Sequence, residues 1–134
     1  MEIDKRDSYE IRKLIIETLK EIKNNVPLIF DIKIEADDRY GENIILTLAP
    51  EPTSIKKLDG EPGEKFEKLG ARIVFHQIYS NGSEVSYQMS YIPGLSDKPK
   101  TELKDKVPRP TISRQYIMEK VLAFLEEVER SEKT

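Results

Sequence analysis

Residues 28–36, LIFDIKIEA, alternate apolar and polar side chains along their whole length, and this pattern constrains the fold most. A period of two places successive side chains on opposite faces of an extended strand. One face is expected to carry Leu28, Phe30, Ile32, Ile34 and Ala36, and the other Ile29, Asp31, Lys33 and Glu35. A strand of this kind is typical of an antiparallel sheet with one covered face and one open face.

Further strands are predicted at residues 43–49, 71–79 and 83–92, which together with 28–36 give two hairpins. Apolar residues recur every three or four positions in segments 7–25 and 112–130, which predicts two helices. Each helix has one apolar stripe to bury, so both should pack on the same face of the sheet. The expected fold is α+β: a two-layer sandwich of a four-stranded antiparallel sheet with the N-terminal and C-terminal helices packed on one face.

The chain has 134 residues, which predicts a single domain over residues 1–134. Segments 50–70 and 93–110 are rich in proline or glycine and are interpreted as long loops. Loops of such length are uncommon in compact domains and are usually functional or mobile. The composition, 37% hydrophobic and 35% charged, is that of a globular chain, and its richness in lysine and glutamate is typical of thermophilic or archaeal proteins and also of AT-rich genomes.

The turn at residues 80–82, Ser-Asn-Gly, decides which side chains of the third strand face the helices. In one register the serine of this turn pairs with Ser83, and His76 faces the helices. In the other, Tyr79 pairs with Ser83, and Phe75 faces the helices instead. The Asn-Gly dipeptide favours the first register. The second is preferred because burying an unpaired histidine and arginine costs free energy, whereas burying isoleucine and phenylalanine is favourable.

Either register leaves apolar side chains on the open face of the sheet. In the first, the candidate interaction surface consists of Ile29, Ile45, Ile73, Phe75 and Tyr79; in the second, Val74 and Ile78 replace the last three. An apolar face usually contacts another molecule. We therefore expect a non-catalytic protein-interaction module, a homodimer that binds itself or a partner through the open face or a strand edge. At the level of topology alone, the order of elements resembles that of small secretion chaperones, which dimerise and bind extended segments of their partners.

The sequence offers little for catalysis or for a cofactor. It has one histidine, His76, and no cysteine, so thiolate metal sites and cysteine nucleophiles are excluded. The serines near His76 lie in strands or turns and form no nucleophile-elbow motif. The carboxylate clusters at 35–38 and 126–129 match no calcium loop. No enzyme activity, cofactor or metal is expected.

The alternative is a small anionic-ligand or nucleic-acid-binding domain whose site is formed by loops 50–70 and 93–110. The candidate anion contacts are Arg72, His76, Lys98, Lys100 and Arg109. The net charge of −3 makes nucleic acid the less favoured ligand. No apolar run is long enough to span a bilayer and no secretory signal is visible, so a cytoplasmic location is expected.

Overall fold

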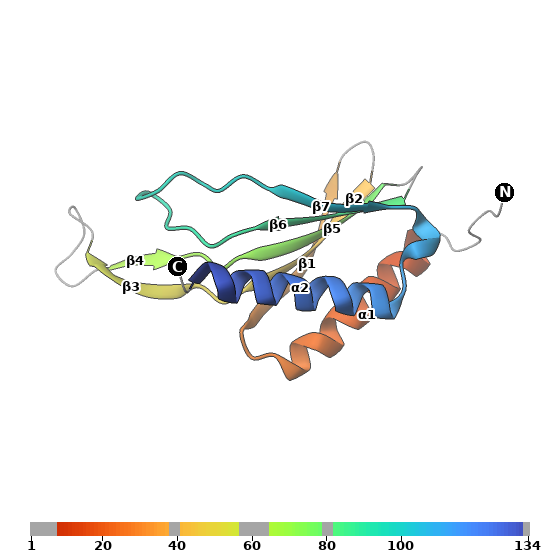
Figure 1. Cartoon of the computed structure of the whole chain (residues 1–134), viewed down its shortest axis with the longest axis horizontal. Helices are drawn as coiled ribbons and strands as arrows, with labels where there is room; N and C mark the ends of the chain where they lie inside the picture. The colour runs from red at the N-terminus through yellow and green to blue at the C-terminus, as the bar shows by residue number, and fades with distance from the viewer. Residues whose placement is uncertain (1–7, 38–40, 57–64, 79–81, 133–134) are drawn as a thin grey trace.

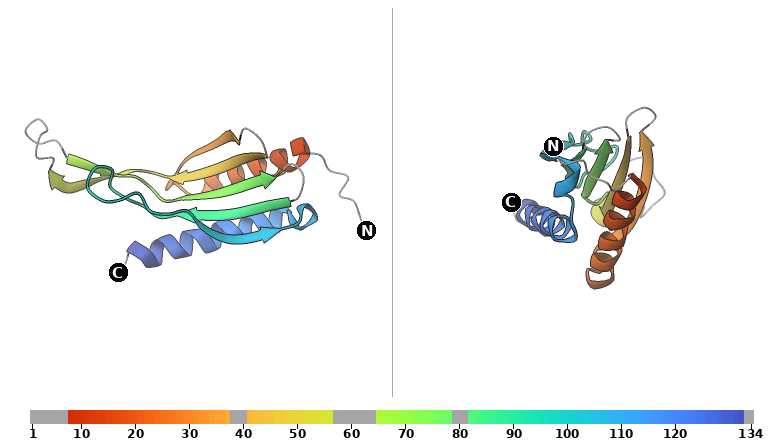
Figure 2. Two further views of the ribbon diagram at one scale, coloured as in Figure 1. Left: turned by 90° about the horizontal axis from the view of Figure 1, so that it is seen from above. Right: turned by 90° about the vertical axis from the view of Figure 1, so that its right-hand side faces the viewer.

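The computed structural model describes residues 8–37, 41–56, 65–78 and 82–132, and in these the chain forms two long helices and two antiparallel sheets (Figure 1). The elements are α1 (Ser8–Asn25), β1 (Ile29–Asp37), β2 (Gly41–Leu48), β3 (Glu51–Lys56), β4 (Lys65–Lys68), β5 (Arg72–Ile78), β6 (Gly82–Gln88), β7 (Glu102–Val107), the 3-10 helix η1 (Arg109–Thr111) and α2 (Arg114–Glu132). The large sheet has the order β1-β2-β5-β6-β7, and both helices cover one of its faces (Figure 2). The expected α+β fold, with two helices packed on an antiparallel sheet, is confirmed.

The number of strands was predicted wrongly, because the large sheet has five strands rather than four. The additional strand, β7, lies in the segment interpreted as a loop and pairs with β6. Its sequence, ELKDKV, has no apolar alternation. The strand packs against the helix layer through charged side chains instead: Lys104 and Asp105 reach α2, where they form ion pairs of 2.9 Å with Glu127 and Lys120. Charged side chains that point inward are a known feature of edge strands.

The segment predicted as loop 50–70 also contains strands, β3 and β4. These strands continue the pairing of β2 with β5: Leu46 lies opposite Ile73, and Glu51 lies opposite Lys68 in the same register. Between the two sheets, the Leu48 amide donates to the carbonyl oxygen of Ala71 at 2.9 Å. Together β2, β3, β4 and β5 form one long hairpin whose outer part projects beyond the helices (Figures 1 and 2).

The core lies between the helices and the large sheet, and the apolar stripes predicted for the helices face it. Its helical members are Ile11, Ile15, Leu19, Ile22, Ile117, Val121, Phe124 and Val128. The Phe124 ring meets the Tyr87 ring edge to face, with 5.2 Å between the centroids. The helix α2 begins after Ser113, whose hydroxyl accepts the Tyr116 amide at 3.1 Å, as an N-cap residue does. Each buried isoleucine or leucine contributes about 1.5–3 kcal/mol through its removal from water.

The facing of Ile29 was predicted wrongly. The pairing of β1 with β2 shifts between Ile29 and Asp31, so that Ile29 lies opposite Leu48 and Ile32 lies opposite Leu46. A bulge of this kind inserts one extra residue and changes the alternation of faces. Ile29 is therefore buried in the core at 4% exposure, on the same side as Ile32. The alternation in the sequence alone does not reveal this shift.

The pairing of β5 with β6 matches neither expected register. His76 lies opposite Glu84 and Phe75 opposite Val85, two residues along from the preferred pairing. A shift by two residues keeps every side chain on its face. Phe75 is therefore in the core and His76 is on the open face, as the preferred register requires. Gly82 has a φ of 98°, a left-handed conformation that favours glycine; the rest of the turn lies outside the described residues.

Candidate anion-binding site

The open face of the large sheet is mostly polar, because alternate residues of its central strands point away from the helices. The strands β2, β5 and β6 present Asn43, Ile45 and Thr47; Arg72, Val74 and His76; and Glu84, Ser86 and Gln88. The edge strand β1 adds Lys33, which lies opposite Ile45. Between these residues, side chains of the helix-facing set such as Ile73 and Phe75 are fully buried. The open face therefore displays hydrogen-bonding and charged groups over an apolar layer.

The first depression on this face has a volume of about 200 Å³ and lies where the large sheet continues into the outer part of the long hairpin. It is lined by Lys33, Thr47, Leu48, Pro50, Leu69, Gly70, Arg72, Gln88, Tyr91 and Lys98. The Arg72 Nε donates to the Gln88 side-chain oxygen at 3.2 Å, which orients the guanidinium. Three of the lining side chains, Lys33, Arg72 and Lys98, are cationic, and none of the lining residues that the structure describes is acidic. In a chain with a net charge of −3, this is a local concentration of positive charge.

The second depression, of about 250 Å³, is also lined by Arg72 and therefore adjoins the first. The other lining residues are Glu35, Asn43, Ile45, Val74, His76, Glu84, Ser86 and Thr101. The His76 Nδ1 lies 2.5 Å from the Asn43 side-chain oxygen. When Nδ1 donates to this oxygen, the neutral ring carries its lone pair on Nε2.

The two carboxylates of the second depression already have cationic partners. Glu35 pairs with Lys33 at 3.0 Å, and Glu84 pairs with Lys106 at 3.7 Å. Both pairs are partly exposed, so each contributes little to stability. They do, however, balance the charge of the second depression. Because Lys33 is the partner of Glu35, the excess of positive charge in the first depression comes from Arg72 and Lys98.

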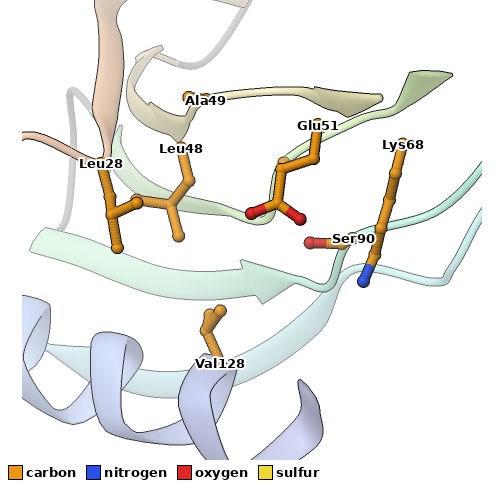
Figure 3. Close-up of a pocket in the computed structure, with 8 residues that line it drawn as sticks. Leu28, Leu48, Ala49, Glu51, Lys68, Ser90 and Val128 are labelled. Carbon is orange, nitrogen blue, oxygen red and sulfur yellow. The ribbon is translucent and has the colours of Figure 1, made fainter. Parts of the chain in front are cut away.

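A third cavity lies on the other side of the sheet, close to the end of α2 (Figure 3). Leu28, Leu48 and Val128 line it together with Glu51 and Lys68 of the small sheet. Its volume of about 50 Å³ suits one or two water molecules. This cavity is too small to be a ligand site.

The structure does not bring the candidate interaction surface to the open face. Ile29, Ile73 and Phe75 lie in the core beneath the helices. Ile45 does lie on the open face, but only 2% of it is exposed. Tyr79 lies outside the described residues. Ile29, Ile73 and Phe75 therefore form no apolar surface on the open face. Val74, which belongs to the surface expected from the preferred register, does lie there, and dimerisation itself stays a prediction.

The candidate anion contacts separate into two groups. Arg72 and His76 line the same depression, and Lys98 lines the other one together with Arg72. Lys100 is exposed and lines neither depression, and Arg109 belongs to η1, beyond the end of β7. Lys33 was correctly predicted to lie on the polar face of its strand. It was missed as a site residue because the pairing of β2 with β5 was not predicted. Gln88 was missed as the residue that orients Arg72.

The connector between β6 and β7, residues 89–101, carries Lys98 and Thr101 and ends at β7. The strand β7 is in turn held by contacts with α2. The Tyr116 hydroxyl donates to Asp105 at 2.7 Å, and Lys120 pairs with the same carboxylate at 2.9 Å. The hydrogen bond from Lys120, followed by the one from Tyr116, lowers the pKa of Asp105. Burial, and then the hydrogen bond to Asp105, raises the pKa of Tyr116. Both groups therefore keep the charge state that their contact requires at neutral pH.

The bond between Lys104 and Glu127 holds β7 at a second point. Lys104 Nζ lies 2.9 Å from the Glu127 carboxylate and 5.3 Å from the centre of the Tyr87 ring. The hydrogen bond that Lys104 donates to Glu127 raises the pKa of Lys104. These contacts explain why a strand without apolar alternation still packs against the helix layer.

The comparisons with known proteins give no functional lead: no family model, no curated protein and no solved structure matches the chain. Within the described residues, no group of three or more histidine and acidic side chains is placed to hold a metal ion. In the same part of the chain, neither helix has the length and apolar character needed to cross a membrane.

Proposed function

We propose that this chain binds a small anionic ligand on the open face of its sheet, with Arg72 as the principal contact. The observation that carries the proposal is the first depression, which is lined by Lys33, Arg72 and Lys98 and, within the described part of the chain, by no acidic residue. A concave surface lined by one sign of charge attracts ligands of the opposite sign. The depression lies between a strand, a hairpin and a connector, where a ligand is held from several sides.

Arg72 is suited to this role by its position and by its neighbours. It lies on the central strand β5 and lines both depressions. Its bond to Gln88 uses Nε and leaves the two terminal nitrogens to bind an anion. A guanidinium matches the paired oxygens of a phosphate or carboxylate, and forms two parallel hydrogen bonds with them.

The nearest acidic residues weaken the positive field without cancelling it. Asp31 lies in the same row as Arg72, separated from it by Thr47. Two strand spacings correspond to about 10 Å between the backbones. Glu35 forms an ion pair with Lys33, one of the cations that line the first depression. The site is also open to water, so we expect a dissociation constant for inorganic phosphate on the order of 1 mM.

Titration calorimetry with inorganic phosphate at low ionic strength tests the proposal. Arg72→Gln should weaken binding at least tenfold, because it removes the bidentate donor, and Lys98→Gln should weaken it several-fold. Lys100→Gln is the matched control, since it removes the same charge from the same connector without touching the depression. Its effect should be within the error of the measurement.

Two outcomes would overturn the proposal. One is the absence of saturable phosphate binding to the wild-type chain at concentrations of tens of millimolar. The other is an equal loss of affinity in Lys98→Gln and Lys100→Gln, since this would mean that the ion responds to overall charge and not to the site. Circular dichroism of each variant establishes that the fold is kept.

A further inference from the structure

The second depression indicates what the rest of the ligand is. It adjoins the anion site through Arg72, and its lining residues include two carboxylates, an amide, an imidazole and two hydroxyls: Glu35, Glu84, Asn43, His76, Ser86 and Thr101. Either depression alone, at about 200 or 250 Å³, is smaller than the roughly 300–1,000 Å³ of typical ligand sites. The two together reach that range.

The charges of the second depression favour a neutral group. A second anion would meet Glu35 and Glu84, and a cation would meet Arg72. Both carboxylates are already paired with lysines, so neither requires a cation from the ligand. Their remaining lone pairs accept hydrogen bonds, and a hydroxyl is a small neutral group that both donates and accepts.

The hydroxyls of a sugar match this set of partners in kind. Carboxylate and amide oxygens accept from sugar hydroxyls, while serine and threonine hydroxyls do either. The contact between His76 and Asn43 fixes the imidazole ring of His76 at one edge of the depression. Val74, which is half-buried above the nearly covered Ile45, provides an apolar floor on which the carbon atoms of a sugar ring can lie.

Resting on the anion site proposed above, we infer that the ligand is a sugar phosphate, with its phosphate in the first depression and its hydroxyls in the second. The charges of Arg72 and Lys98, with Lys33 shared between the ligand and Glu35, suit a doubly charged phosphate better than a singly charged carboxylate. Arg72, which lines both depressions, contacts the ligand where its two parts join.

The experiment compares ribose 5-phosphate with methyl phosphate, which has the same phosphate ester and no sugar hydroxyls. We expect ribose 5-phosphate to bind about tenfold more tightly to the wild-type chain, and ribose alone to show no measurable binding. Glucuronate, a sugar with a carboxylate in place of the phosphate, should bind more weakly than ribose 5-phosphate.

Glu84→Gln tests the contribution of the second depression separately from that of the first. It removes a hydrogen-bond acceptor from the second depression and a negative charge from the neighbourhood of Arg72. The preference for ribose 5-phosphate should therefore fall to about twofold, while methyl phosphate binds as well as before or slightly better. Glu126→Gln, an exposed carboxylate of α2, is the control that removes the same charge from the helix side.

The outcomes distinguish this inference from the proposed function. Equal affinities for ribose 5-phosphate and methyl phosphate would overturn the sugar inference and leave the anion site standing. An unchanged preference in Glu84→Gln, or tighter binding of glucuronate, would also overturn it. If neither phosphate binds to the wild-type chain, both proposals are wrong.

Discussion

The two faces of the large sheet differ in how their polar groups are satisfied. On the helix side, Glu42 is 3% exposed and binds Arg12 of α1 through two contacts of 2.7 and 2.8 Å. On the open side, Glu84 is 29% exposed and its lysine partner lies at 3.7 Å. The helix α1 thus supplies a close partner to the buried carboxylate of Glu42. The open face leaves its charged groups to water, to long side chains and to a ligand.

The two arginines of this comparison have different roles. Arg12 holds Glu42 in a bidentate ion pair at the edge of the core, and Gln77 adds a bond of 3.4 Å to the same carboxylate. Arg72 is oriented by a neutral amide. A charged group whose partner is a buried carboxylate stabilises the fold, while one that is oriented by a neutral group keeps its charge for another molecule.

The largest difference between the faces is expected for neighbouring residues of β5. Phe75→Ala should lower the free energy of unfolding by about 3–5 kcal/mol, because it leaves a cavity beneath the helices. Val74→Ala, on the open face, should cost less than about 1 kcal/mol. Urea denaturation followed by circular dichroism measures both. Equal costs for the two variants would contradict the assignment of faces.

The next largest difference is expected for the two glutamates. Glu42→Gln weakens a buried ion pair, and since the Arg12 side chain is 36% exposed its charge still reaches water. The expected cost is therefore about 2 kcal/mol, below the 3–5 kcal/mol of a fully buried pair. Glu84→Gln should change stability by less than about 0.5 kcal/mol. A Glu84→Gln variant as unstable as Glu42→Gln would mean that the open face is structural.

Much of this arrangement can be predicted from the sequence. Both helices, their apolar stripes and the antiparallel sheet follow from periodicity, because each pattern reports on a local backbone geometry. The facing of Arg72 and His76 follows from the cost of burying them. These features depend only on which side of an element a residue occupies.

The features that the sequence does not reveal depend on distant partners. The strand β7 is stable because Glu127 and Lys120 of α2 bind its charged residues, and no local pattern encodes this. The facing of Ile29 depends on a bulge. The meeting of Lys33, Arg72 and Lys98 requires the pairing of β2 with β5 and the path of a connector. The alternative hypothesis from the sequence assigned Arg72 and Lys98 to one anion site but missed Lys33.

A smaller effect, of opposite sign, is expected for the serines of β6. Ser83 is 2% exposed on the helix side, and within the described part of the chain its hydroxyl oxygen has no hydrogen-bond partner. A buried hydroxyl without a partner costs free energy. Ser83→Ala should therefore stabilise the fold by about 1 kcal/mol, while Ser86→Ala on the open face leaves it unchanged. Destabilisation by Ser83→Ala would show that its hydroxyl has a partner in solution.

The smallest effect is expected in the pH dependence of the free energy of unfolding, through the contacts between β7 and α2. The hydrogen bond from Lys120 and then that from Tyr116 hold the pKa of Asp105 below its usual value of 3.8. A carboxyl group whose pKa is lowered on folding stabilises the folded state above its unfolded pKa, and this contribution is lost as the pH falls through the folded pKa. Asp105→Asn should therefore be less stable than the wild type at pH 7, and the two should converge as the pH falls through the folded pKa of Asp105. Urea denaturation at a series of pH values measures this difference.

Tyr116→Phe tests the cause of that pH dependence. It removes one of the two side-chain hydrogen bonds to Asp105 and keeps the ring that packs beside Lys120. The pKa of Asp105 should then rise part of the way toward its usual value, because the bond from Lys120 remains. The acid limb of the stability curve should lie between those of the wild type and Asp105→Asn. An acid limb identical to that of the wild type would assign the whole effect to Lys120.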